Sequence, residues 1–257
     1  MNAVEVRNLS FNYKGAFVFD KLNFNVKKGS FITIVGKGGS GKSTLFNILS
    51  GNLKYDGSIL IHDNSINAAT EKGYLGFVSP DLDYFKEKTV IDELIGALKY
   101  KGGDYDKISS NIDKISKKIG INNILNKEIK YLSVKEKVLV MFAMQCLLRP
   151  KVLVIDNCFS ILDCEKDMVV KEIKRVFKNR TVIDITNDTN ECLIGQEVLF
   201  LKNNPVKKDV HLLDGDDFLS NNLDIPFMIM LSERLKFYGL TDKVYLDVER
   251  LIDDLWR

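Results

Sequence analysis

The sequence predicts an α/β protein, and three observations carry the prediction. Continuous apolar runs at residues 152–155 and 182–183 enclose a segment of helical periodicity, which is typical of parallel strands buried on both faces. A strand-like run ends at residue 35 in a glycine-rich stretch that leads into a helix. With 257 residues, of which 45% are hydrophobic, the chain is long enough for one large domain and a small appendage.

The first third of the chain is rich in strand-like segments. Runs that mix β-branched and aromatic residues at strand length, or that are short and apolar, predict strands at residues 4–9, 17–26, 30–35, 58–61 and 76–78. A helical pattern covers residues 42–50 and ends at Gly51, since glycine is a common residue just past a helix.

The middle of the chain is mainly helical. A helical pattern covers residues 89–118 and is interrupted near Gly102 and Gly103. Residues 134–148 predict a long apolar helix that ends at Arg149 and Pro150. A further helix is predicted over residues 166–178, between the two apolar strands.

Two short amphipathic helices are predicted after residues 203–205, where the composition changes. The first begins near Pro226 and ends at Gly239. The second is expected to be capped by Thr241 and Asp242, with an apolar stripe formed by Val244, Val248, Leu251 and Leu255. Because two such helices cannot bury both stripes alone, docking onto the main domain and contact with a second chain both remain open.

Composition excludes several classes of protein. Lys and Arg number 37 and Asp and Glu number 35, so the net charge of +2 argues against a nucleic-acid binder dominated by charge. The longest uncharged apolar run, residues 138–148, is shorter than the ~20 residues that span a bilayer. The four cysteines lack C-x-x-C spacing, which predicts neither a zinc site nor a disulfide framework. We expect a protein of the reducing cytosol without a secretory signal.

A phosphate-binding loop is the strongest motif. The pattern G-x-x-x-x-G-K-[ST] is satisfied by Gly36, Lys37, Gly38, Gly39, Ser40, Gly41, Lys42 and Ser43, followed by Thr44. Its glycines let backbone N–H groups point inward, and the helix N-terminus adds partial positive charge for a polyphosphate. Lys42 is expected to reach the β- and γ-phosphates, and Ser43 to bind Mg²⁺. The alternative is a flexible glycine turn before a helix.

An acid at the end of a buried strand supplies the second half of the predicted metal site. Asp156 directly follows the apolar run 152–155 and is expected to hold Mg²⁺ through water. A strand that ends in Asp is weak evidence alone, but together with the phosphate loop it predicts a site for a nucleotide and Mg²⁺.

Four further motifs resemble those of ABC-type ATPases, and the resemblance covers the whole chain. Tyr13 matches the aromatic residue that stacks on adenine in that family. The family signature Leu-Ser-Gly-Gly-Gln is similar to Leu132, Ser133, Val134, Lys135 and Glu136. The stretch from Ser160 to Asp163 is similar to the family's Ser-Ala-Leu-Asp loop, and Thr186, Asn187 and Asp188 match its Thr-His-Asp.

That resemblance implies a P-loop (RecA-like) core with an antiparallel β subdomain, an inserted helical subdomain and a small C-terminal helical extension. The nucleotide-binding domain would cover residues 1–205, with the helical subdomain at about 86–133, and the extension residues 206–257. In such a protein, ATP with Mg²⁺ lies between the phosphate loop of one chain and the signature of the other.

The finer match is to the ATPases of energy-coupling-factor importers, which take up vitamins, cobalt or nickel. Residues 77–81, Phe85 and residues 89–93 resemble their stretch after the glutamine loop, and residues 231–235 resemble the C-terminal extension through which they pair. The resemblance implies a second ATPase subunit, expected to be an intact paralogue, and a transmembrane coupling subunit. The chain would then lie peripherally on the cytoplasmic face of the membrane.

Several family positions differ in this chain. Ser79 replaces the family's glutamine, Asn157 its catalytic glutamate and Asn187 its switch histidine, while Val134 and Lys135 replace the signature glycines. Gly38 also stands where the family's phosphate loop has asparagine. An amide at position 157 cannot take a proton from water, and general-base assistance contributes ~10²–10⁴ in rate. We therefore expect ATP binding with weak or partner-dependent hydrolysis.

The signature has a second interpretation. Ser133 and Glu136 form an S-x-x-E capping box ahead of an apolar helix, which requires no ligand. We expect the cap to orient a helix that faces the partner's nucleotide, with the charge of Lys135 as possible partial compensation for the missing glycine.

Three functions compete at this point. The first is a transport-coupled ATPase that converts ATP and water to ADP and phosphate. The second is a non-hydrolysing pseudo-ATPase that holds or regulates an active partner, and the third is a soluble ABC-type protein acting on DNA or ribosomes. The interval from Lys42 to Ser133 is too short for a long coiled coil, and the chain carries one phosphate loop, so the third is disfavoured.

Overall fold

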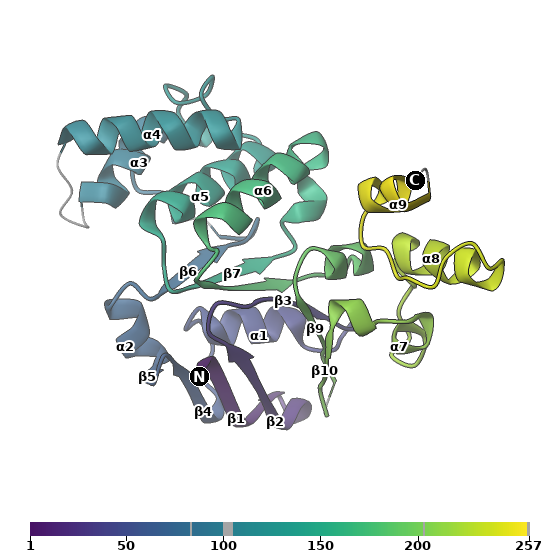
Figure 1. The fold of residues 1–257 in the computed structure, drawn as a ribbon. Helices are drawn as coiled ribbons and strands as arrows, with labels where there is room; N and C mark the ends of the chain where they lie inside the picture. Colours follow the sequence, from purple (N-terminus) through teal and green to yellow (C-terminus); the bar gives the residue numbers. More distant parts are fainter. Residues whose placement is uncertain (83, 100–104, 203, 256–257) are drawn as a thin grey trace.

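A mainly parallel sheet forms the centre of the protein (Figure 1). The structure, a computed structural model, describes residues 1–82, 84–99, 105–202 and 204–255. The sheet has the strand order β10-β9-β3-β8-β7-β6, in which neighbours from β9 to β6 are parallel and β10 is antiparallel. Its strands are β3 (Phe31–Val35), β6 (Leu75–Val78), β7 (Val152–Asp156), β8 (Thr181–Ile185), β9 (Glu197–Phe200) and β10 (Val206–Asp209).

A smaller antiparallel sheet lies beside the central one. Its order is β2-β1-β4-β5, with β1 (Asn2–Tyr13), β2 (Ala16–Lys27), β4 (Asp56–Ile61) and β5 (Asn64–Ser65). β1 and β2 are longer than the sequence predicted, since the hairpin continues to a turn at Lys14 and Gly15, both of which have positive φ. The α/β class predicted from the apolar runs is confirmed.

The sheet is surrounded by helices, some of which cover its two faces. The α-helices of the described residues are α1 (Lys42–Leu49), α2 (Ile66–Glu71), α3 (Val90–Lys99), α4 (Tyr105–Ile119), α5 (Val134–Leu148), α6 (Lys166–Val176), α7 (Gly215–Leu219), α8 (Phe227–Phe237) and α9 (Val248–Leu255). α5 and α6 lie on one face and α1 on the other (Figure 1). Within the described part of the chain, no helix has the length and apolar character needed to cross a bilayer.

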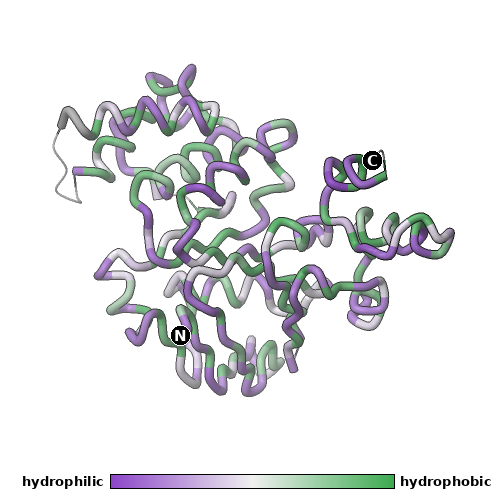
Figure 2. The backbone as a smooth tube through the Cα atoms, viewed as in Figure 1, coloured by the Kyte–Doolittle hydropathy of each residue, from purple (hydrophilic) through white to green (hydrophobic). Residues whose placement is uncertain are grey.

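Alternation along the central strands divides the core. Leu153 and Ile155 of β7 pack with α5 and α6, whereas Val152 and Val154 pack with α1 and the antiparallel sheet. Figure 2 shows hydrophobic residues along these central strands. Because side chains in a strand point alternately to opposite faces, each strand must be apolar throughout, which explains the continuous runs in the sequence.

The helix predicted over residues 134–148 is confirmed as α5, and the C-terminal helix that follows Pro226 is confirmed as α8. The predicted interruption near Gly102 and Gly103 falls on residues 100–104, outside the described residues. α3 ends before that stretch and α4 begins after it.

The predicted start of the last helix is wrong. α9 begins at Val248, and Asp247, not Thr241 or Asp242, accepts a hydrogen bond from the Arg250 N–H group. The preceding segment is held in an irregular conformation by Tyr245, which is 5% exposed and whose N–H group donates to the Ser232 hydroxyl at 2.9 Å. Burial of this ring therefore overrides the local capping signal.

One carboxyl group lies unpaired in the core. Asp184, the next-to-last residue of β8, is 0% exposed, and neither of its carboxylate oxygens has a hydrogen-bond partner among the described residues. Burial raises the pKa of Asp184 well above its usual value, and the charge of Glu191 raises it further, against the opposing effect of Lys166. The side chain is therefore protonated over a wider pH range in the folded than in the unfolded protein.

Replacement of this group should stabilise the protein. We expect Asp184→Val to raise the free energy of unfolding at pH 8 by about 1–3 kcal/mol, because an unpaired buried polar group is removed. Since the folded-state pKa is raised, the wild-type stability should fall as pH rises above the unfolded value, and the variant should lack this fall. Denaturant unfolding at pH 5 and pH 8 measures both effects.

The exposed Asp20 on β2 provides the control, since Asp20→Val should leave the pH dependence unchanged. A lower stability of Asp184→Val than of the wild type at pH 8 would contradict the prediction.

Candidate functional site

The glycine-rich loop between β3 and α1 is shaped by its neighbours. Gly39 and Gly41 have φ of 78° and 93°, a region that favours glycine. A Cβ atom at Gly41 would come within 2.6 Å of the Phe19 ring, and one at Gly36 within 2.8 Å of the Leu201 carbonyl oxygen. A Cβ atom at Gly38 would have nothing within 4 Å, so a side chain at this position is not sterically excluded.

Lys42 points back into this loop. Its side chain is 6% exposed, and its ammonium group donates to the carbonyl oxygens of Gly36 and Lys37, the latter at 3.2 Å. Burial lowers the pKa of Lys42, and the carboxylate of Asp156 opposes that effect. Ser43 is exposed on the first turn of α1, whereas Thr44 is buried. A lysine and a helix N-terminus thus converge on the same loop, as binding of a polyphosphate requires.

Asp156 ends β7 and is 5% exposed. Burial raises the pKa of Asp156 to about 6, and Asp81 raises it as well, while Lys42 and a hydrogen bond from Asn157 lower it. A buried carboxylate that still lacks full charge compensation is the type of oxygen donor that Mg²⁺ prefers. The residues present therefore fit a divalent cation beside the phosphate loop.

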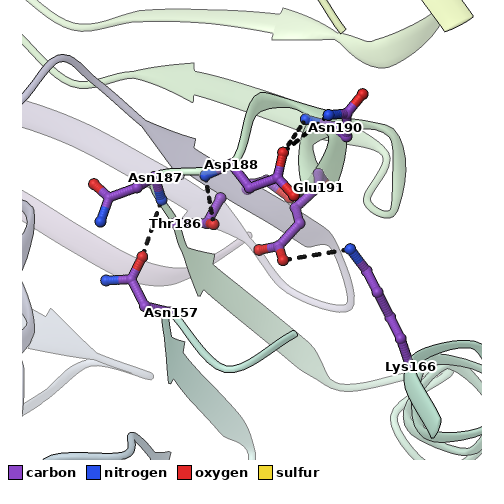
Figure 3. A network of polar contacts seen from close by, with 8 residues as sticks. Asn157, Lys166, Thr186, Asn187, Asp188, Asn190 and Glu191 are labelled. Carbon is purple, nitrogen blue, oxygen red and sulfur yellow. Dashed lines mark hydrogen bonds and ion pairs between the residues drawn. The ribbon is translucent and has the colours of Figure 1, made fainter. Parts of the chain in front are cut away.

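Asn157 joins this aspartate to the neighbouring strand. Its amide nitrogen donates to the Asp156 carboxylate at 3.0 Å, and its amide oxygen accepts a hydrogen bond from the Asn187 N–H group at 3.0 Å. Figure 3 shows the side chain of Asn157 below the backbone of Asn187. Both functions of the amide are engaged, and neither can remove a proton from water.

The segment after β8 is held by local contacts. The Thr186 hydroxyl accepts a hydrogen bond from the Asp188 N–H group at 3.0 Å, and the Asp188 carboxylate caps the short 3-10 helix that follows. Asn187 is exposed between them. Ser79, by contrast, follows β6, is fully buried and accepts a hydrogen bond from the Asp81 N–H group at 3.3 Å. The Ser79 hydroxyl is therefore engaged by the backbone of the turn that follows β6.

Phe17, and not Tyr13, lines a groove at the phosphate loop. A groove of about 380 Å³ is lined by loop residues together with Phe17 and Val18 of β2. Tyr13 is 50% exposed, packs edge-on against Phe11 and does not line this groove. Phe17, at 69% exposure, is a second aromatic candidate that the sequence motif did not reveal, because only the hairpin fold brings it to the loop.

The signature residues lie at the N-terminus of α5, on the other face of the sheet from α1. The predicted capping box is confirmed, since the Ser133 hydroxyl accepts from the Glu136 N–H group and the Glu136 carboxylate accepts from the Ser133 N–H group. Leu132 is buried, whereas Val134 is 56% exposed.

The charge of Lys135 is engaged within the chain. Its ammonium group contacts both carboxylate oxygens of Glu165 at 3.1 Å. This contact joins the start of α5 to the segment that follows Asp163, whose φ is 46°. Lys135 is therefore an ion-pair partner in this structure, and Glu165 is a residue that the sequence motifs did not single out.

Two further acidic residues were missed from sequence. Asp81 acts on Asp156 through its charge, and Glu191, which is 0% exposed, pairs with Lys166 at 3.4 Å behind the Asn187 segment (Figure 3). The sequence carries an acid within the otherwise apolar residues 182–185, but that acid is Asp184 and does not indicate Asp81 or Glu191.

Comparison with known proteins agrees with this geometry. The family described as ABC transporter matches residues 19–160. The energy-coupling factor transporter ATP-binding protein EcfA1 of Streptococcus thermophilus is 30% identical over 98% of this chain and 98% of its own length. EcfA1 of Mycoplasma capricolum is 31% identical over 98% of this chain and 65% of its own length.

A solved structure has the same fold. The cbiO1 protein of Clostridium perfringens, described as part of the ABC transporter complex cbiONQ, superposes with a TM-score of 0.69 and 25% identity, over 93% of this chain and 97% of its own. The chain therefore belongs to the ABC transporter family and, within it, groups with the ATP-binding subunits of energy-coupling factor transporters.

Proposed function

We propose that this chain binds ATP with Mg²⁺ firmly, hydrolyses it weakly or only with the help of its partner, and couples these steps to uptake of a vitamin or metal ion. The single observation that carries the proposal is the Asn157 amide, which bridges Asp156 and Asn187 where a catalytic carboxylate is expected. The elements for binding lie beside it, and the amide itself cannot accept a proton from water.

Binding is supported by the phosphate loop and Asp156. Lys42 and the N-terminus of α1 would receive the phosphates, and Ser43 with Asp156 would hold Mg²⁺. When bound, Mg²⁺ supplies positive charge that neutralises phosphate oxygens. An anion in the loop would also replace the carbonyl contacts that Lys42 makes in this structure.

Weak hydrolysis is supported by what position 157 can do. The amide has no basic lone pair at neutral pH, and its two hydrogen bonds hold it to Asp156 and to the Asn187 backbone. Asn187 lacks the charge that a protonated histidine could direct at a phosphate. Ser79 is buried in its own turn, so it cannot extend to the metal as a glutamine would.

The assembly would contain a second ATPase subunit and a transmembrane coupling subunit. Val134 and Lys135 would face the partner's nucleotide across the interface, and we expect the partner to be an intact paralogue that carries a catalytic carboxylate at its own nucleotide site. The segment 206–257 would contribute to pairing, which is supported by exposed aromatic side chains at the C-terminal end of α8, Phe237 at 85% and Tyr238 at 73% exposure. The chain would be peripheral to the membrane.

A second candidate function has its own support. In a non-hydrolysing pseudo-ATPase, ATP would hold the dimer closed or regulate the active partner. The ion pair of Lys135 with Glu165 favours this candidate, because it removes from the signature the positive charge that could have compensated for the missing glycine.

The aromatic contact to the base can be assigned by two substitutions. We expect Phe17→Ala to weaken Mg-ATP binding by about 1–3 kcal/mol, the range of base–aromatic stacking, and Tyr13→Ala to weaken it less, because Phe17 lines the groove at the phosphate loop. Calorimetric titration of both variants measures the order, and a larger loss for Tyr13→Ala would assign the base to the family position instead.

Binding should depend on pH through Asp156. Its raised pKa means that the carboxyl group is protonated below pH of about 6, where it can no longer hold Mg²⁺. We expect the affinity ratio of wild type to Asp156→Asn for Mg-ATP to fall by up to about tenfold per pH unit below that value. Protonation of ATP itself affects both proteins equally, so a ratio that stays constant from pH 5 to 8 would exclude the effect.

Restoring the missing groups should restore turnover. We expect the double variant Asn157→Glu, Asn187→His to release phosphate about a hundredfold faster than the wild type, at the lower end of the ~10²–10⁴ that a general base contributes. Asn157→Gln with Asn187→His is the matched control without a base and should stay slow. A wild-type rate equal to that of the double variant, and abolished by Lys42→Ala, would overturn the proposal of weak hydrolysis.

A further inference from the structure

A groove at the amino ends of the central strands collects positive charge. It has a volume of about 570 Å³ and is lined by Lys28, Gly29, His62, Lys151, Arg175, Val176, Lys178, Asn179, Arg180 and Thr181. Half of these residues are Lys or Arg, and the lining formed by the described residues includes no Asp or Glu. The whole chain carries 37 basic and 35 acidic residues, so this is a local departure from an almost balanced surface.

Three of the cations stand at the starts of adjacent strands. Lys28 precedes β3, Arg180 precedes β8 and Lys151 precedes β7, and these strands are neighbours in the order β3-β8-β7. Arg180 and Lys151 directly precede the paired residues Thr181 and Val152, on strands that are ~4.8 Å apart, and Lys28 lies three residues before the start of β3. The parallel register of the sheet therefore places like charges side by side.

Backbone contacts fix this row. The guanidinium group of Arg180 donates to the carbonyl oxygens of Arg149 and Pro150, at 2.6 and 3.1 Å. The Gly29 N–H group donates to the Thr181 hydroxyl at 3.1 Å, and the Thr181 N–H group donates to the Lys151 carbonyl oxygen at 3.0 Å. The starts of the three strands are thus tied together.

Most of this charge is not neutralised within the chain. Arg175 pairs with Glu172, whereas Lys28, Lys151, Lys178 and Arg180 form no ion pair with a carboxylate of the described residues. Lys151 instead lies over the Tyr74 ring, 3.4 Å from its centre. A row of like charges without counter-charges is unfavourable by itself, and an anion would relieve the repulsion.

We propose that this groove binds a multiply charged phosphate group at a site separate from the nucleotide site. Its volume lies within the ~300–1,000 Å³ of small-molecule pockets. Arginine and lysine are the side chains that recognise phosphate oxygens. A multiply charged phosphate group carries more negative charge than a single carboxylate, so it compensates several cations at once. The phosphate could belong to a soluble oligophosphate or to a lipid headgroup, which share this chemistry.

The two sites lie at opposite ends of the same strands. The phosphate loop, Asp156 and Asn187 follow the carboxyl ends, whereas the groove surrounds the amino ends. A strand of five residues spans about 17 Å, which is too far for one phosphate chain to contact Lys42 and the groove together. The inference therefore goes beyond the proposed function and does not depend on it.

The pKa of His62 can report whether an anion binds in the groove. It lines the groove, and burial together with the charges of Lys28 and Lys151 lowers its pKa. An anion between these lysines should reverse their effect and raise that pKa. The chain has two histidines, so the ring signals of His62 can be assigned in NMR spectra by comparison with His211→Gln.

We expect inorganic tripolyphosphate to shift the His62 ring signals saturably and to raise the pKa of His62. In Lys28→Gln, Lys178→Gln the affinity for tripolyphosphate at this site should fall at least tenfold, whereas Lys114→Gln, an exposed lysine on α4, should bind as the wild type does. Lys42→Ala should lose Mg-ATP binding and keep the His62 response. Retained Mg-ATP binding shows that the double variant is folded. If the double variant does not bind Mg-ATP, Lys178→Gln alone gives a second comparison.

Vesicles of phosphatidic acid, whose phosphate monoester carries more than one negative charge near neutral pH, distinguish the source, with phosphatidylcholine vesicles as control. Binding of either tripolyphosphate or phosphatidic acid that is lost in the double variant supports the site and identifies the form of phosphate. Absence of a His62 response to both ligands, or an equal affinity in the wild type and in the Lys28 and Lys178 variants, would overturn the proposal.

Discussion

The parallel pairing of β3, β8, β7 and β6 is the constraint on which both sites depend. Because these strands run in the same direction and are buried on both faces, their carboxyl ends meet at one edge of the sheet and their amino ends at the other. The first edge brings together Lys42, Asp156 and Asn187, which are far apart in the sequence. The second edge brings together Lys28, Arg180 and Lys151 in the same way.

At the carboxyl edge, one amide connects two strand ends. Asn157 donates to Asp156 and accepts from the Asn187 N–H group, so it ties the end of β7 to the segment after β8. A carboxylate could not donate a hydrogen bond to Asp156. In the proposed function, binding and hydrolysis would therefore depend on different atoms of neighbouring residues.

The start of α5 is held by one local and one long-range contact. Lys135 forms an ion pair with Glu165. The cap formed by Ser133 and Glu136 orients α5 through local hydrogen bonds alone. Because the cap depends on residues three apart and the ion pair on residues thirty apart, only the cap could be predicted from the sequence.

The sequence by itself determined the α/β class, the phosphate loop, the strand that ends in Asp156 and the extent of α5, because each depends on local periodicity or on a short motif. Tertiary structure decided the rest. Burial of Tyr245 moved the start of α9 past Thr241 and Asp242, and the β1–β2 hairpin brought Phe17 to the phosphate loop. Contacts between residues distant in the chain depend on how strands pair and helices pack, and no local pattern encodes that information.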